Sequence, residues 1–124
     1  MQSDELMAWL GPAADELTAE QIERVAAEVA PIAEMYPHPD QQDQRDAALY
    51  AVVQYLLGET TPEEAGRALI DARSREREAF AAATWMAVML VRDNPPKGRR
   101  GYKKQAAERA GIDRMSLLKA LGER

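Results

Sequence analysis

The sequence predicts an all-α fold, a helical bundle of about five to six helices that ends in a C-terminal helix-turn-helix. No segment sustains the two-residue alternation of apolar and polar side chains that a half-buried strand requires. Apolar residues recur instead at spacings of three and four, which places them on one side of a helix. Typical capping residues stand at the ends of these periodic segments, so each segment can be assigned a beginning and an end.

Two helices are expected in the first 35 residues. Ser3 can cap a short helix that ends at Gly11, which is followed by proline. Thr18 and Gln21 have the spacing of a capping box, in which each side chain binds the other residue's backbone amide. That box opens a second helix, and Pro31 is expected to kink or end it.

A third helix is expected over roughly residues 40–57. The segment 36–40 before it holds two prolines and is expected to form a turn at the surface. Gly58 is expected to stop the helix. The apolar residues of this segment recur at helical spacing: Leu49, Val52, Val53, Leu56 and Leu57.

The fourth helix has the clearest start. Thr61 can cap it, Pro62 suits its first position, and two glutamates follow near the positive end of the helix dipole. The helix is expected to reach about Asn94, with a break possible near residues 71–74. Residues 80–91 are nearly apolar on all sides, which predicts the central helix of the core. A basic loop with two prolines and two glycines follows it.

Charge divides the chain into two regions. Residues 1–62 carry twelve acidic and two basic side chains, whereas residues 63–124 carry nine acidic and fourteen basic ones. We therefore expect an acidic N-terminal region, 1–60, for dimerisation or partner docking, and a second region, 61–124, for DNA binding. The dimer contacts expected in the acidic region are Trp9, Leu49, Val53 and Leu56. Alternatively, the acidic region covers the central helix within one monomer.

The last twenty residues have the layout of a helix-turn-helix. Small residues allow a second helix to cross closely over the first one, Gly111 suits the turn, and Ile112 can enter the core. Asp113 can cap the second helix, in which Leu117 and Leu121 lie one turn apart. The small residues of the first helix are Ala106, Ala107 and Ala110.

The stretch from Gln105 to Gly122 resembles the helix-turn-helix of the factor-for-inversion-stimulation (Fis-type) family. That family has paired alanines, Gly-Ile at the turn, an arginine two residues later, and two leucines four residues apart. The residues that match here are Ala106, Ala107, Gly111, Ile112, Arg114, Leu117 and Leu121. Leu118 departs from the pattern, because the family usually has a polar or basic residue there. It is expected to contact a thymine methyl group, the central helix or a partner.

The resemblance implies that the second helix enters the major groove of DNA. Arg114 and Ser116 are then candidates for base-edge or phosphate contact, and Lys119 for phosphate contact. The basic loop and the first helix are expected to meet the backbone. The predicted DNA-binding residues are Arg99, Arg100, Tyr102, Lys103, Lys104, Asp113, Arg114, Met115, Ser116 and Lys119.

Other function classes have no support in the sequence. The chain has no cysteine and one histidine, His38, so no metal site, cofactor or catalytic residue is expected. Its acidic start and short apolar runs predict neither a signal peptide nor a membrane span. We expect a cytoplasmic, dimeric, bacterial transcriptional regulator that binds double-stranded DNA. The alternatives are a plasmid or phage DNA-maintenance factor and a protein-interaction module that docks a partner helix.

Overall fold

The computed structural model describes residues 2–94 and 102–123, and the predicted all-α fold is confirmed. Within these residues there are seven α-helices, one 3-10 helix and no strand. The chain forms two compact units, Met1–Gly66 and Arg67–Arg124, which we call the N-terminal and C-terminal units. In the described part of the chain no helix is both long enough and apolar enough to span a bilayer.

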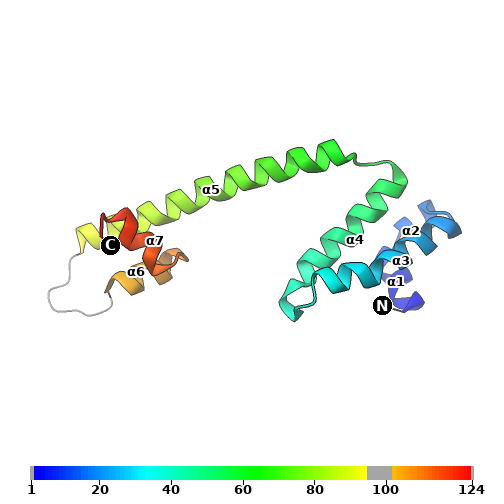
Figure 1. Cartoon of the computed structure of the whole chain (residues 1–124), viewed down its shortest axis with the longest axis horizontal. Helices are drawn as coiled ribbons and strands as arrows, with labels where there is room; N and C mark the ends of the chain where they lie inside the picture. Colours follow the sequence, from blue (N-terminus) through cyan, green and yellow to red (C-terminus); the bar gives the residue numbers. More distant parts are fainter. Residues whose placement is uncertain (1, 95–101, 124) are drawn as a thin grey trace. The chain divides into compact units, whose positions relative to one another are not determined.

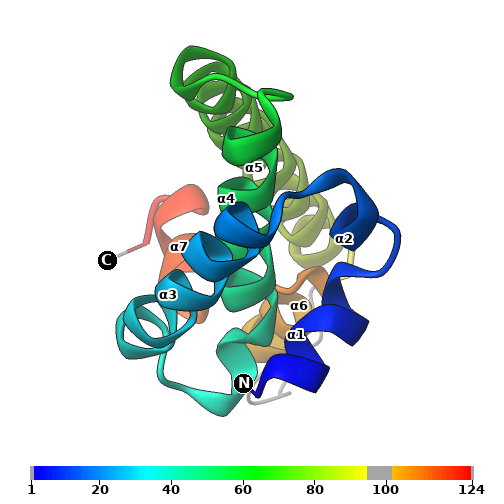
Figure 2. The same cartoon turned by 90° about the vertical axis from the view of Figure 1, so that its right-hand side faces the viewer.

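The N-terminal unit consists of short helices around the helix pair α3 (Ala19–Met35) and α4 (Gln42–Leu57), which pack against each other (Figures 1 and 2). The predicted capping box begins α3: the Gln21 amide donates to the Thr18 hydroxyl at 3.1 Å, and the Thr18 amide donates to the Gln21 side chain at 2.9 Å. Gly58 adopts φ 71° and ends α4 as expected. The elements are α1 (Ser3–Leu10), α2 (Ala13–Glu16), α3 (Ala19–Met35), η1 (Pro39–Gln41) and α4 (Gln42–Leu57).

Two helix ends in this unit differ from the predictions. Gln2 occupies the cap position of α1, so Ser3 is the first helical residue instead of the cap. Pro31 was expected to kink or end α3; it does not end the helix, which continues for one more turn to Met35. Proline removes one backbone donor, and the helix tolerates that loss this close to its C-terminus.

The N-terminal unit has its own hydrophobic core. Val25 of α3 is fully buried, and Leu49 and Val53 of α4 are buried against it. Trp9 and Leu56 are partly buried around the same core. The expected dimer contact through Leu49 and Val53 is therefore wrong, because these side chains already fill the interior of their own unit.

Helix α5 (Pro62–Asp93) begins where the sequence predicts and runs without the possible break at residues 71–74. The Glu64 amide donates to the Thr61 hydroxyl at 3.1 Å, which satisfies one of the first amides of the helix. The residue range of α5 crosses the boundary between the two units. The part of α5 from Arg67 onward belongs to the C-terminal unit and carries its packing surface.

The apolar half of α5 is not buried on all sides as predicted. One side of it is buried, whereas Trp85, Met86 and Met89 are 52, 72 and 46% exposed. Phe80, one turn before the buried side begins, is also exposed. The buried side consists of Thr84, Ala87, Val88 and Val91. The apolar residues of this part of α5 therefore form two different surfaces, and only one of them is covered within the C-terminal unit.

Candidate nucleic-acid interface

The C-terminal unit ends in two short helices, α6 (Tyr102–Ala110) and α7 (Arg114–Ala120). We call residues 102–123 the α6–α7 hairpin. Gly111 adopts φ 72° between the helices. Its amide donates to the Glu108 carbonyl at 3.1 Å, and the Ile112 amide donates to the Ala107 carbonyl at 3.0 Å. These two bonds form a Schellman motif, which requires the left-handed conformation that glycine adopts at least cost.

Asp113 caps α7 as the sequence predicts. Its carboxylate accepts hydrogen bonds from the Ser116 amide at 2.8 Å and from the Ser116 hydroxyl at 2.6 Å. The hydroxyl bond, followed by the amide bond, lowers the pKa of Asp113 below its ordinary value of 3.8. Both side chains are therefore engaged in starting the helix, and the hydroxyl of Ser116 has already used its one donor.

A second hydrophobic core holds the hairpin against α5. Leu117 of α7 is fully buried, and Ala106 and Ala107 of α6 are buried with it against Ala87, Val88 and Val91 of α5. Alanine at both α6 positions leaves room for the backbones to approach closely. Ile112, Ala120 and Leu121 pack around this core from the turn and from the end of α7. The burial of Leu117 fixes which side of α7 faces outward.

Three residues of α7 are exposed: Arg114, Met115 and Lys119. Met115 is 66% exposed, which is high for a large apolar side chain. On α6 the exposed cations are Lys104 and Arg109. The sequence analysis did not select Arg109, although its positive charge in the last turn of the first helix could have suggested it.

The carboxylates of the hairpin are engaged within the hairpin itself. Glu123 accepts from the Lys103 ammonium at 2.5 and 2.6 Å. Glu108 lies 4.0 Å from Lys104, and Asp113 forms the cap of α7. Among the described residues no carboxylate lies within 4 Å of the Arg109, Arg114 or Lys119 side-chain nitrogens. Three exposed cations of the hairpin are thus left to face the solvent.

The predicted DNA-binding residues therefore divide into groups. Arg114, Met115, Lys119 and Lys104 are exposed. Lys103 is held by Glu123, and its ammonium also lies 5.8 Å from the centre of the Tyr102 ring. Tyr102 itself is partly buried against the second core, and Asp113 and Ser116 form the cap. Arg99 and Arg100 lie outside the described residues.

Leu118, which departs from the Fis-type pattern, is partly buried on α7. It is not among the described side chains that pack against the second core. It follows the fully buried Leu117 by one residue and therefore points to a different side of the helix. Leu118 adds a partly exposed apolar group beside the cationic surface.

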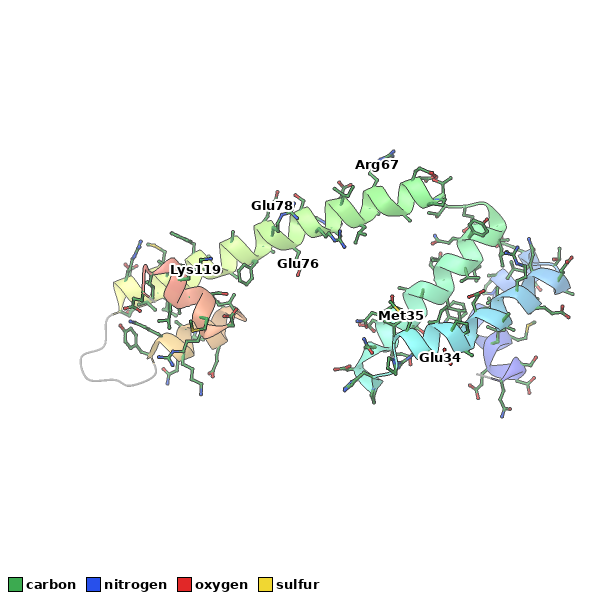
Figure 3. The ribbon with its side chains drawn as sticks, viewed as in Figure 1. Glu34, Met35, Arg67, Glu76, Glu78 and Lys119 are labelled. Atoms are coloured by element: carbon green, nitrogen blue, oxygen red, sulfur yellow. The ribbon has the colours of Figure 1, made fainter. Side chains whose placement is uncertain are left out.

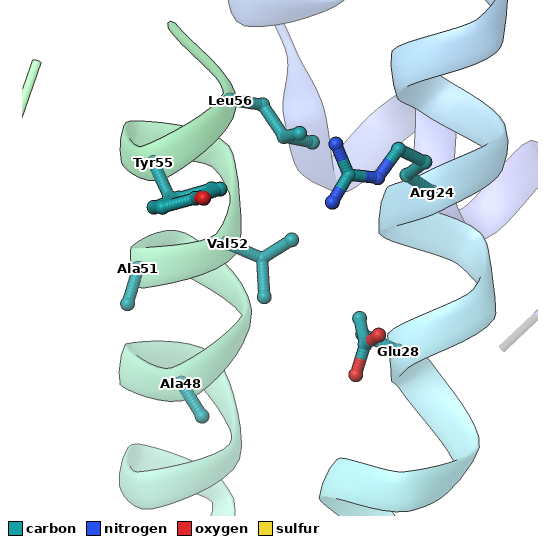
Figure 4. A pocket seen from close by; sticks show the side chains of 7 residues that line it. All are labelled: Arg24, Glu28, Ala48, Ala51, Val52, Tyr55 and Leu56. Carbon is teal, nitrogen blue, oxygen red and sulfur yellow. The ribbon is translucent and has the colours of Figure 1, made fainter. Parts of the chain in front are cut away.

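Elsewhere the described residues offer little that resembles a site. A shallow hollow between α3 and α4 is lined mainly by apolar side chains, and Arg24 extends from α3 toward Val52 and Leu56 (Figure 4). His38 lies in an exposed turn with its Nδ1 2.6 Å from Asp40. No group of three potential metal ligands occurs among these residues.

No protein-family model matches the chain, and comparison with curated proteins and with solved structures finds no similar protein.

Proposed function

We propose that the protein binds double-stranded DNA through the α6–α7 hairpin, with α7 in the major groove. The observation that carries the proposal is that Arg114, Met115 and Lys119 of α7 are exposed while Leu117 anchors the helix. A short helix held by its neighbours and offering exposed cations is suited to groove recognition. Lys104 and Arg109 supply further positive charge on α6.

The positions of the two α7 cations suggest different roles. Arg114 is the first residue of α7, and the first turn of a recognition helix is the part that reaches base edges. Its guanidinium can donate two hydrogen bonds to guanine O6 and N7. Lys119 lies more than a turn later, where a flexible ammonium is suited to a phosphate. Ser116 contributes mainly by holding the cap.

We further propose that the protein is a bacterial transcriptional regulator that acts in the cytoplasm as a dimer. A motif of this size covers few base pairs, and a two-fold dimer gains specificity by contacting two half-sites. The acidic N-terminal unit is then directed away from DNA, because its fourteen acidic and two basic side chains give it a net charge of −12, which would repel phosphates. That unit is free to dock a protein partner.

The test is selection of bound sites from a pool of random duplexes, followed by titration at several salt concentrations. The wild type should enrich a defined sequence, and its affinity should fall steeply as salt rises. Arg114→Ala should cost about 1–3 kcal/mol on the selected site and relax specificity at one base pair. Lys119→Ala should weaken binding to all sequences alike. Arg24→Ala, an exposed arginine of the N-terminal unit, is the control and should bind as the wild type does.

A second candidate function is a module that docks a partner helix on α7. Met115 is exposed and Leu118 is partly exposed, so apolar groups lie beside the cations. Salt separates the two candidates, because contacts between apolar surfaces do not weaken as ionic strength rises. Failure to enrich any duplex sequence, with no salt-dependent binding to random duplex, would reject the DNA proposal.

A further inference from the structure

Helix α5 carries a second apolar surface, on the side away from the second core. Trp85, Met86 and Met89 lie there with 46 to 72% of their surface exposed. Three large apolar side chains on adjacent turns of one helix form a contiguous patch rather than scattered surface residues. Such a patch on the part of α5 that belongs to the C-terminal unit indicates a contact with another molecule.

The patch belongs to a regular pattern along α5. Residues at alternating spacings of four and three define one line on the helix, which we call the heptad face. Every member of this face is exposed. The residues buried beneath the α6–α7 hairpin occupy other positions of the seven-residue repeat. The heptad face consists of Ala68, Ala72, Arg75, Ala79, Ala82, Met86, Met89 and Asp93.

Opposite charges bracket the apolar part of the heptad face. Arg75 and Asp93 are eighteen residues apart, which is five turns at 3.6 residues per turn, so they lie on the same line of the helix. Between them stand two small residues, Ala79 and Ala82, followed by two large ones, Met86 and Met89. When a second copy of the helix runs in the opposite direction, each charge therefore meets the opposite charge, and each large side chain meets a small one.

We propose that a second copy of this chain packs antiparallel along the heptad face, around a two-fold axis near Thr84. Arg75 then lies opposite Asp93 of the partner subunit, and the symmetry repeats this pair at the other end. Met86 lies opposite Ala82 of the partner subunit, and Met89 lies opposite Ala79 of the partner subunit. Each layer joins a large side chain to a small one, which allows close packing.

The flanking residues favour the same arrangement. Glu78 extends from the side of α5 opposite to Glu76 (Figure 3), and it lies near Arg92 of the partner subunit when the helices run antiparallel. Trp85 lies beside the axis and meets Trp85 of the partner subunit. A parallel pair would instead place Arg75 against Arg75 and Asp93 against Asp93. Repulsion between like charges therefore selects the antiparallel pair and its register.

This inference rests on α5 alone and does not depend on DNA binding. The test reverses the charge at each of the two positions and measures self-association by sedimentation equilibrium. Each charge occurs twice in a two-fold dimer, so Arg75→Asp and Asp93→Arg should each weaken self-association by at least about tenfold. An equimolar mixture of the two variants should form a heterodimer, because every layer then regains opposite charges. Arg73→Asp, on the other side of α5, is the control and should leave the dimer unchanged.

Disulfide cross-linking tests the direction of the helices, and the absence of native cysteine makes any introduced pair unique. A mixture of Ala79→Cys and Met89→Cys should cross-link between the two variants on mild oxidation. Neither variant should cross-link to itself, because the two copies of position 79 would lie about 15 Å apart along the axis at 1.5 Å per residue.

Three results would overturn the proposal. The first is a wild type that remains monomeric at about 0.1 mM, a concentration at which even a weak dimer with a micromolar Kd is populated. The second is a dimer that keeps its affinity in both charge variants while their helicity is that of the wild type. The third is self-cross-linking of Ala79→Cys, which would show parallel helices.

Discussion

Replacing Leu117 with alanine is expected to release the α6–α7 hairpin from α5. Leu117 is fully buried and is the largest fully buried side chain of the molecule's described part. It enters a core in which the fully enclosed residues of α6 are the alanines Ala106 and Ala107. Because these small neighbours cannot extend into the space that the leucine leaves, the substitution creates a cavity that stays largely unfilled.

The magnitude follows from the atoms removed. Three carbons are lost, and at about 0.8 kcal/mol each the transfer term is roughly 2.4 kcal/mol. The residual cavity raises the expected loss to about 3–5 kcal/mol, within the range of buried leucine-to-alanine changes. A unit of about 60 residues has a free energy of unfolding of roughly 3–9 kcal/mol. The substitution therefore removes a third or more of the stability of the C-terminal unit.

Amide hydrogen exchange, resolved by NMR, measures the effect residue by residue. The protection of the α6 and α7 amides should fall, whereas that of α3 and α4 should not, because the N-terminal unit has its own core around Val25. Trp9 lies in the N-terminal unit and Trp85 in the C-terminal unit, so their two indole N–H resonances report on the two units separately. Leu118→Ala is the matched control: it removes the same atoms from a partly buried site and should cost less than about 1 kcal/mol.

The reasoning would be refuted if Leu117→Ala left the protection of the α6 and α7 amides unchanged. It would be refuted equally if Leu118→Ala cost as much as Leu117→Ala, because the neighbouring leucine would then carry the packing. A loss of protection in both units together would contradict their separation into two cores.

Substitutions at two glycines and one titration give the remaining predictions. Gly111→Val should cost about 1–3 kcal/mol in thermal unfolding, because φ is 72° there, and a variant as stable as the wild type would refute the assigned turn. Gly66→Ala, inside α5 with no described atom within 4 Å of the new methyl, should instead stabilise the chain by up to about 1 kcal/mol. The cap at Asp113 is complete above the ordinary pKa of 3.8 and is lost as pH falls through the lowered folded pKa. The Ser116 amide resonance should therefore move in acid, and a constant resonance down to about pH 2 would contradict the cap.

Helix ends were predictable wherever a local hydrogen bond decides them. Thr18, Thr61 and Asp113 were each assigned from sequence, and each side chain accepts the expected backbone amide. These bonds span three residues, so the information lies within the segment itself. Ser3 was misassigned, because the cap position of α1 is occupied by Gln2. Whether α3 continues past Pro31 depends on the stability of one more helical turn, and the spacing of residues in the sequence does not predict that stability.

Burial was less predictable than helix ends. Periodicity identified the apolar side chains of α5 and of α4, but it does not say which partner covers them. Leu49 and Val53 were expected at a dimer contact and instead fill the core of the N-terminal unit. Trp85 and Met86 were expected in the core and are exposed. The same limit applies to the hairpin, where Lys103 is engaged by Glu123, which lies twenty residues later in the chain.

The two apolar surfaces of α5 explain why its second half is apolar on nearly every side. Ala87, Val88 and Val91 meet the α6–α7 hairpin, and the heptad face runs along the opposite side. Because the two sets occupy different positions of the repeat, both can be covered at once. A dimer formed through the heptad face would therefore leave Arg114 and Lys119 exposed in each copy. The proposed association through α5 and the proposed DNA binding through α7 are thus compatible, and each should be removable by substitution without disturbing the other.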